Sequence, residues 1–442
     1  MASDPGPFDH VLTTDGFRAP FYTLRFDAAG RSTSPLTQEH LVDALRSNIF
    51  TDVYLFSHGW NNDWNAALAN YRAFIAAYQS LVRDKGLELG RDQRPLLVGI
   101  FWPAAAMELP WEHGPDIAGA GDDIGERDVA LEAAFATEVA PADRAEFYRL
   151  VEPPAVDEIA GRRLLDLLGA VYAGGDADLP KDDRRRPDDV LAAWAMLESA
   201  LTGRPDLPDS PDDFGVAAGE RAGAPDAAGL LSKLDPRNLF RMLTVYRMKD
   251  RAGAVGADGV GPVLREMLEA TTAATRFHLV GHSYGARVLL NAVSRPTGAP
   301  LPRQVDSLLL LQPAVNHLCF SAARPEGGYR AAAELVRHPI MTTYSVHDFP
   351  LRTVFHLALR RGKDLGDIGI AGDEPPNEYA ALGGYGPRGE LSFAEVTIKD
   401  PGDPYDLTAA EVLAVDGSRT IGGHSDISGP STAWMLFSLV KG

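Results

Sequence analysis

The feature that most constrains the fold of this chain is a serine flanked by glycines, where an apolar run meets an apolar helical pattern. Residues 276–280 (RFHLV) are followed by residues 281–285 (GHSYG), and residues 286–293 (ARVLLNAV) have helical spacing. A strand that turns sharply into a helix strains one residue, and glycines two positions away let the neighbouring backbone pass. The oxygen of Ser283 then projects beside the positive end of the helix dipole. We therefore predict that Ser283 is a nucleophile; the alternative is a tight turn without chemistry.

Short apolar runs alternate with helical patterns through most of the chain. We expect strands at residues 21–27, 52–57, 96–101, 276–280, 307–311, 340–346 and 393–398. We expect helices at residues 36–45, 68–81, 238–249, 263–271, 286–293 and 431–440. Alternation of this kind is typical of parallel strands joined by crossover helices. The sequence therefore predicts a three-layer α/β fold with a mostly parallel sheet of about eight strands.

Residues 105–235 interrupt this alternation. They contain no clear strand and two helix candidates, at residues 159–171 and 190–201. They also hold 29 acidic and 12 basic residues, and so carry most of the formal charge of −19. We predict a helical insertion, a lid or cap that shapes a substrate cleft, between core segments 1–104 and 236–442. The alternative is an acidic surface excursion without a role.

A second motif follows the strand expected at residues 52–57. Residues 57–62 are SHGWNN. Acyl transfer needs two N–H donors directed at the developing oxyanion, one just after the nucleophile and one from the loop after an earlier strand. We predict that Tyr284 and Trp60 supply them, and we place the substrate-binding residues at His58, Gly59, Asn61 and His282. The alternative is that the loop residues only pack and cap locally.

The order of three motifs resembles the α/β-hydrolase superfamily. HGWNND begins at His58, GHSYG at Gly281 and GGHSD at Gly422. The resemblance covers about residues 1–104 and 236–442 and is strongest to bacterial and fungal esterases and lipases. It implies a serine hydrolase that cleaves carboxylic esters, with a triad in the chain order serine, acid, histidine.

The other two triad positions are chosen by matching that order. His424 is the histidine that lies near the C-terminus, beyond the last expected strand, and Asp348 follows the strand expected at residues 340–346. We predict that His424 is the general base and Asp348 the acid. Asp306 lies at the start of its strand, and therefore at the amino-terminal edge of a parallel sheet, whereas the triad acid must lie at the carboxyl edge. The remaining alternatives are Asp364, Asp367 and Asp373 in a glycine-rich loop.

Two further histidines are assigned by position. His278 lies within the strand before the nucleophile, and we predict a core histidine with satisfied hydrogen bonds. His282 is adjacent to Ser283, and we predict that its side chain points away from the base. His317, His338, His347 and His356 come too early in the chain for the triad order.

Composition narrows the classes of partner. A formal charge of −19 argues against nucleic-acid binding. The single cysteine, Cys319, excludes an intramolecular disulfide. We see no signal peptide and no run of about 18 apolar residues, so we expect no membrane insertion and a cytoplasmic location. No metal or cofactor motif is present, and none is expected.

The expected substrate is a small-molecule or lipid-like ester. The alternatives that share the triad are a thioesterase, an amidase and an acyltransferase. A non-catalytic binding module on the same fold is the alternative from another class, because fold alone does not establish activity.

Overall fold

The computed structural model describes residues 5–60, 62, 64–89, 92–104, 132–172, 186–202, 233–322, 328–355, 380–390 and 392–442. The chain divides into two compact units. Unit 1 comprises Met1–Ala105, Met248–Arg352 and Ala380–Gly442, and unit 2 comprises Ala106–Arg247 and Thr353–Tyr379. Residues 236–247, which we expected in the core, therefore group with unit 2. Residues 353–379, which we also expected in the core, form the second stretch of unit 2.

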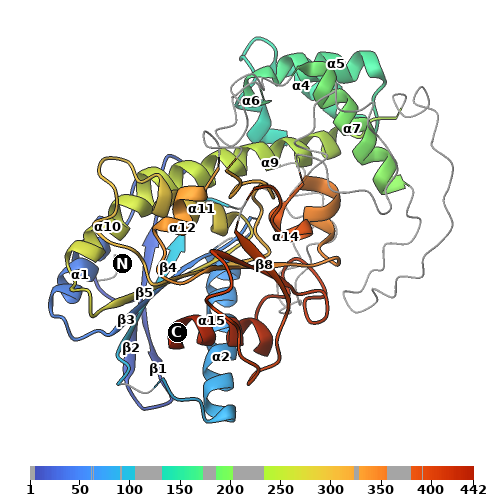
Figure 1. Ribbon diagram of the computed structural model, residues 1–442. Helices are drawn as coiled ribbons and strands as arrows, with labels where there is room; N and C mark the ends of the chain where they lie inside the picture. Colours follow the sequence, from blue (N-terminus) through green and yellow to red (C-terminus); the bar gives the residue numbers. More distant parts are fainter. Residues whose placement is uncertain are drawn as a thin grey trace. The chain divides into compact units, whose positions relative to one another are not determined.

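A nine-stranded sheet lies at the centre of unit 1 (Figure 1). Its strand order is β1-β2-β4-β3-β5-β6-β7-β9-β8. The β1–β2 pair is antiparallel and every other neighbouring pair is parallel. In chain order the strands are β1 (Asp9–Leu12), β2 (Arg18–Arg25), β3 (Asp52–Ser57), β4 (Pro95–Phe101), β5 (Arg276–His282), β6 (Ser307–Leu311), β7 (Ile340–Tyr344), β8 (Phe393–Thr397) and β9 (Val412–Asp416). The prediction of an α/β fold with a mostly parallel sheet is confirmed.

Helices cover both faces of this sheet. On one face α2 (Trp64–Lys85) packs against α15 (Pro430–Lys441), and on the other α11 (Tyr284–Ser294) contacts β3 and β5 (Figure 1). The second face also carries α1 (Pro35–Arg46), the π-helical turn η1 (Val255–Val260), α10 (Gly261–Glu269) and α12 (Arg330–Glu334). Two shorter elements are η2 (Pro350–Val354), which follows β7 in the chain, and α14 (Leu382–Tyr385), which contacts β7.

The spacing of apolar residues along α2 explains why this helix packs on the sheet. Its buried residues recur every three or four positions and form one apolar stripe. The stripe packs on side chains from β2, β3 and β4, which are buried along nearly their whole length. Strands buried on both faces are typical of parallel sheets covered by helices. The core of unit 1 therefore fixes the central strands, whose carboxyl ends carry the candidate site.

Unit 2 is helical in its described residues. It contains α4 (Arg144–Val151), α5 (Glu158–Leu167), α6 (Gly169–Tyr172), α7 (Pro187–Thr202) and the first part of α9 (Pro236–Ala254). Helices occupy both predicted positions of the insertion, whereas α4 was not predicted. Trp194 is fully buried, and its indole N–H donates to the carboxylate of Glu198 and to the carbonyl of Asp235. No helix in the described part of the chain is long and apolar enough to cross a membrane.

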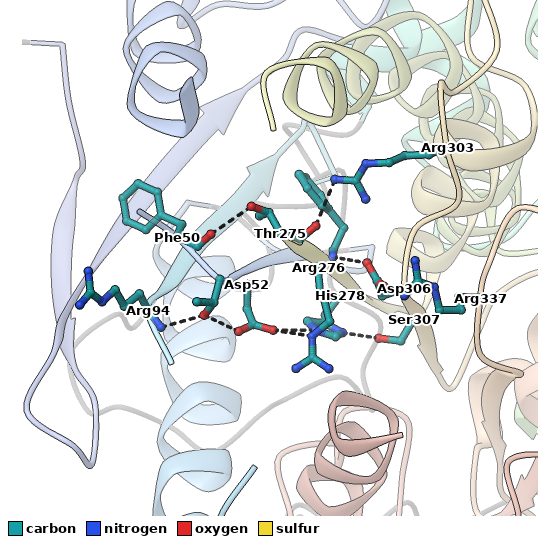
Figure 2. A network of polar contacts seen from close by, with 12 residues as sticks. Phe50, Asp52, Arg94, Thr275, Arg276, His278, Arg303, Asp306, Ser307 and Arg337 are labelled. Carbon is teal, nitrogen blue, oxygen red and sulfur yellow. Dashed lines mark hydrogen bonds and ion pairs between the residues drawn. The ribbon is translucent and has the colours of Figure 1, made fainter. Parts of the chain in front are cut away.

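Three buried polar side chains connect adjacent strands at the amino-terminal edge of the sheet (Figure 2). His278 on β5 lies with Nδ1 2.8 Å from Ser307 Oγ on β6 and with Nε2 3.1 Å from Asp52 Oδ1 on β3. Asp52 also accepts hydrogen bonds from Thr51 Oγ1 and Arg276 Nε. Burying polar groups is tolerated only when they are paired. His278 is thus a core histidine, as predicted, and its bonds hold β3, β5 and β6 in register.

We predict that Asp52→Ala lowers the free energy of unfolding by about 3 kcal/mol, because it leaves His278 and Arg276 without the carboxylate. Urea denaturation measures the change. The matched control is Asp43→Ala, which removes an exposed carboxylate paired with Arg46 and costs less than about 1 kcal/mol. Equal unfolding midpoints for the two variants would contradict the role of this network.

Candidate active site

Ser283 occupies a strained turn between β5 and α11. Its φ is 54° and its ψ −124°, in a region that residues with a side chain rarely adopt. The turn is held by backbone hydrogen bonds: Ser283 N–H donates to the Leu311 carbonyl at 3.0 Å, and the Ser283 carbonyl accepts from Ala314 N–H at 3.2 Å. The neighbouring strand β6 and the loop after it therefore maintain the strain.

The two glycines of the motif are required by close packing. A Cβ added at Gly281 would lie 2.8 Å from the Ala286 backbone, and one added at Gly285 would lie 2.1 Å from the Ser57 carbonyl oxygen. Real Cβ atoms do not approach backbone atoms this closely. The sequence pattern thus follows from the strand-to-helix turn, as the position of Ser283 predicted.

The structure brings Ser283, His424 and Asp348 together. His424 Nε2 lies 2.9 Å from Ser283 Oγ, and His424 Nδ1 lies 2.8 Å from Asp348 Oδ2. One neutral tautomer satisfies both contacts, with Nδ1–H donating to the carboxylate and Nε2 accepting from the hydroxyl. Asp348 is completely buried, whereas the His424 side chain is 13% exposed. This arrangement can remove a proton from Ser283 and hold the resulting imidazolium beside a carboxylate.

His282 does not point away from the base, and that prediction is wrong. Its ring centroid lies 4.9 Å from that of His424, and its Nε2–H donates to the His424 carbonyl at 2.9 Å. The loop that carries His424 passes over His282 as well as Ser283, which strand periodicity alone does not reveal. Burial, followed by the charge of His424, lowers the pKa of His282 to about 3. His282 is therefore a neutral support for the backbone of His424.

His58 supports the turn that follows β3. Its ring stacks on that of Trp102, with centroids 5.4 Å apart. Its Nδ1 lies 2.9 Å from the Gly59 carbonyl oxygen, and its Nε2 accepts from Trp102 N–H at 3.3 Å. Burial lowers the pKa of His58 to about 4, so the ring is neutral with its proton on Nδ1. Both ring nitrogens are engaged and the residue is 3% exposed, so the His58 side chain supports this turn, and its predicted part in substrate binding stays a prediction.

Gly59 brings this turn against the nucleophile. A Cβ at Gly59 would lie 2.6 Å from Ser283 Cβ. The Gly59 carbonyl contacts His58 Nδ1, and it also accepts from Asn62 Nδ2 at 3.2 Å. Because a peptide unit is planar and trans, holding this carbonyl fixes the opposite direction for the Trp60 N–H. The Trp60 ring lies edge-on to that of Tyr284, with centroids 6.5 Å apart.

Two residues near this site were missed by sequence reasoning. Asn62 donates to the carbonyls of Gly59 and Trp60, and Gln312 donates to the carboxylate of Asp348. Gln312 directly follows the carboxyl end of β6, so a search of every strand end would have found it. Asn61 lies outside the described residues, as do the alternative acids Asp364, Asp367 and Asp373.

The described residues show no group of three or more His, Cys, Asp or Glu side chains arranged to hold a metal ion. Comparison of the chain with models of known protein families, with curated proteins and with solved structures found no match.

The two neutral histidines predict loss of stability in acid. A histidine in an unfolded chain has a pKa near 6.5, whereas the folded-state pKa values are about 4 for His58 and about 3 for His282. The unfolded state therefore binds more protons below about pH 6.5, and each histidine lowers the free energy of unfolding by up to about 1.4 kcal/mol per pH unit. The decrease continues until the pH passes the folded-state values.

Urea denaturation at pH 7, 6 and 5 measures this slope. His282→Gln keeps a side-chain N–H donor but cannot titrate. The slope should therefore fall by the equivalent of about half a proton between pH 7 and 6 and of nearly one proton between pH 6 and 5. The exposed His10→Gln variant is the control and should retain the slope of the unmodified chain. If His282→Gln also retains it, the buried neutral state of His282 is wrong.

Proposed function

We propose that this chain is a serine hydrolase with the α/β-hydrolase fold, and that it cleaves carboxylic esters through an acyl-enzyme on Ser283. The observation that carries the proposal is the continuous pair of contacts from Ser283 Oγ to His424 and from His424 to Asp348, at 2.9 and 2.8 Å. The strained backbone of Ser283 adds support, because such strain is found where a reactive side chain must be presented.

In the proposed mechanism His424 Nε2 takes the hydroxyl proton as Ser283 Oγ attacks the acyl carbon. His424 then protonates the leaving alcohol, and water, activated by the same nitrogen, releases the acid and restores Ser283. Asp348 holds the tautomer with the proton on Nδ1 and stabilises the imidazolium. Its burial favours this role, since electrostatic interactions are stronger away from water.

The proposed oxyanion donors are the backbone N–H groups of Tyr284 and Trp60. Tyr284 begins α11 directly after the nucleophile, where helix N–H groups have no intrahelical acceptor. The contact of Gly59 with Ser283 and the fixed Gly59–Trp60 peptide support the second donor. Preorganised donors of this kind act where negative charge develops in the transition state.

The preference for esters over thioesters, amides and acyl transfer rests on the resemblance of the three motifs to esterases and lipases. Unit 2 leaves unit 1 after Ala105 and after Arg352, and both points follow the carboxyl ends of parallel strands. This connectivity supports the lid interpretation of the insertion, which stays a prediction. A panel of p-nitrophenyl esters of increasing acyl length tests whether the chain hydrolyses esters and how large its acyl site is.

We predict that a fluorophosphonate probe labels the protein and that Ser283→Ala abolishes both labelling and ester turnover, because the probe reacts with an activated serine. Ser294→Ala, at the other end of α11, is the matched control and should label normally. A chain that folds but takes up no probe, or a Ser283→Ala variant that still labels, would argue for a binding module.

We predict that Gly59→Ala lowers kcat by about 100- to 1,000-fold, because its Cβ would meet Ser283 Cβ at 2.6 Å and displace the Trp60 N–H. The control is Gly6→Ala, where the added Cβ meets only His40 Nε2, at 4.0 Å. Both variants are compared by turnover of a p-nitrophenyl ester and by thermal unfolding. An unchanged kcat in Gly59→Ala would exclude this turn from oxyanion binding.

A further inference from the structure

Gln312 contacts the proposed triad from behind the acid. It follows β6 directly and is completely buried. Its Nε2 lies 2.8 Å from Asp348 Oδ2, the same oxygen that His424 Nδ1 contacts at 2.8 Å. A carboxylate only accepts hydrogen bonds, so the amide must present its N–H₂ group to Asp348.

The Asp348 carboxylate is consequently held at both oxygens. Oδ1 accepts from the backbone N–H of Leu351 at 3.0 Å, while Oδ2 accepts from Gln312 and His424. Rotation about the Cβ–Cγ bond would break all three contacts. Charge-assisted hydrogen bonds of this kind are about twice as strong as neutral ones.

The backbone of Gln312 is strained at the residue whose side chain contacts Asp348. Its φ is 45°, a left-handed conformation that a buried residue with a long side chain rarely adopts. Its N–H donates to Thr343 Oγ1 on β7 at 2.8 Å, and the preceding carbonyl, that of Leu311, accepts from Ser283 N–H. Gln312 thus links the strand beside the nucleophile to the loop that carries the acid.

We infer that Gln312 is a positioning residue: its amide fixes Asp348 so that Oδ2 faces His424 throughout the reaction. The inference rests on the proposed function, which requires Asp348 to orient His424. Without the amide only the Leu351 and His424 contacts oppose rotation of the carboxylate, so the acceptor of the imidazole is less firmly fixed. Within the described part of the chain, the hydrogen bonds of Gln312 go to Thr343 and Asp348, and not to Ser283 Oγ or to the proposed oxyanion donors.

The test compares two substitutions of similar volume, each followed by the pH dependence of kcat/KM for p-nitrophenyl acetate. Gln312→Met removes the donor, and we expect kcat/KM to fall about 10- to 100-fold at every pH. Gln312→Glu can donate only while the introduced carboxyl and that of Asp348 share a proton, because two adjacent carboxyls do not both ionise readily. We therefore expect Gln312→Glu to lose activity at alkaline pH, where the unmodified chain stays on its plateau.

Matched controls are Gln304→Met and Gln304→Glu, since Gln304 is exposed and donates to the Glu334 carbonyl. They should keep the unmodified profile. If both Gln312 variants lose thermal stability but keep the unmodified rate and shape of profile, Gln312 is only structural and the inference is overturned. If the unmodified chain itself neither hydrolyses the ester nor takes up the fluorophosphonate probe, the proposed function fails first, and the inference fails with it.

The proton NMR signal of the His424 Nδ1–H gives a readout independent of turnover. In Gln312→Met it should move, because Asp348 Oδ2 loses a competing donor, and in Gln304→Met it should not. An unmoved signal in Gln312→Met would overturn the inference even if its activity fell.

Discussion

The backbone hydrogen bond from Ser283 N–H to the Leu311 carbonyl is the interaction on which the candidate site depends. It holds the nucleophile in a turn with positive φ that a serine would not keep by itself, and it joins the ends of β5 and β6. The residue after that carbonyl, Gln312, has a strained backbone of its own and reaches the acid. Two strained residues therefore lie at the ends of neighbouring strands: Ser283 is held by the carbonyl of Leu311 on β6, and Gln312 by Thr343 on β7 and by Asp348.

The same three side-chain types occur at both edges of the sheet with opposite consequences. Asp52, His278 and Ser307 at the amino-terminal edge form a chain of contacts like that of Asp348, His424 and Ser283 at the carboxyl edge. The first set is entirely buried and lies on three strands, so it can only stabilise their register. The second contains a loop histidine that is partly exposed, and it ends on Ser283 at the amino-terminal end of α11. Exposure and backbone setting, not residue type, distinguish a structural triad from a candidate catalytic one.

The sequence was sufficient for features determined by chain order and strand polarity. Ser283, Asp348 and His424 each follow a strand or the last expected strand, and the parallel sheet brings such positions to one edge. Short elements were harder to predict. The four-residue β1 alternates between half-buried and exposed positions and was not predicted. The strand β9, which lies between β7 and β8 in the sheet, has only five residues and was also missed, so residues 393–398 were wrongly taken as the last strand. The orientation of His282 and the reach of Gln312 depend on where a distant loop passes, and local periodicity contains no information about that path.

Every hydrogen bond described above among the triad, its supports and the turn at Gly59 is made within unit 1. The residues that form these hydrogen bonds come from the three stretches of chain that make up unit 1. None of the bonds involves a residue of the acidic helical stretch. A substitution in the described residues of unit 2 therefore removes no partner from these hydrogen bonds. The composition of the helical unit is in this sense independent of the geometry around Ser283.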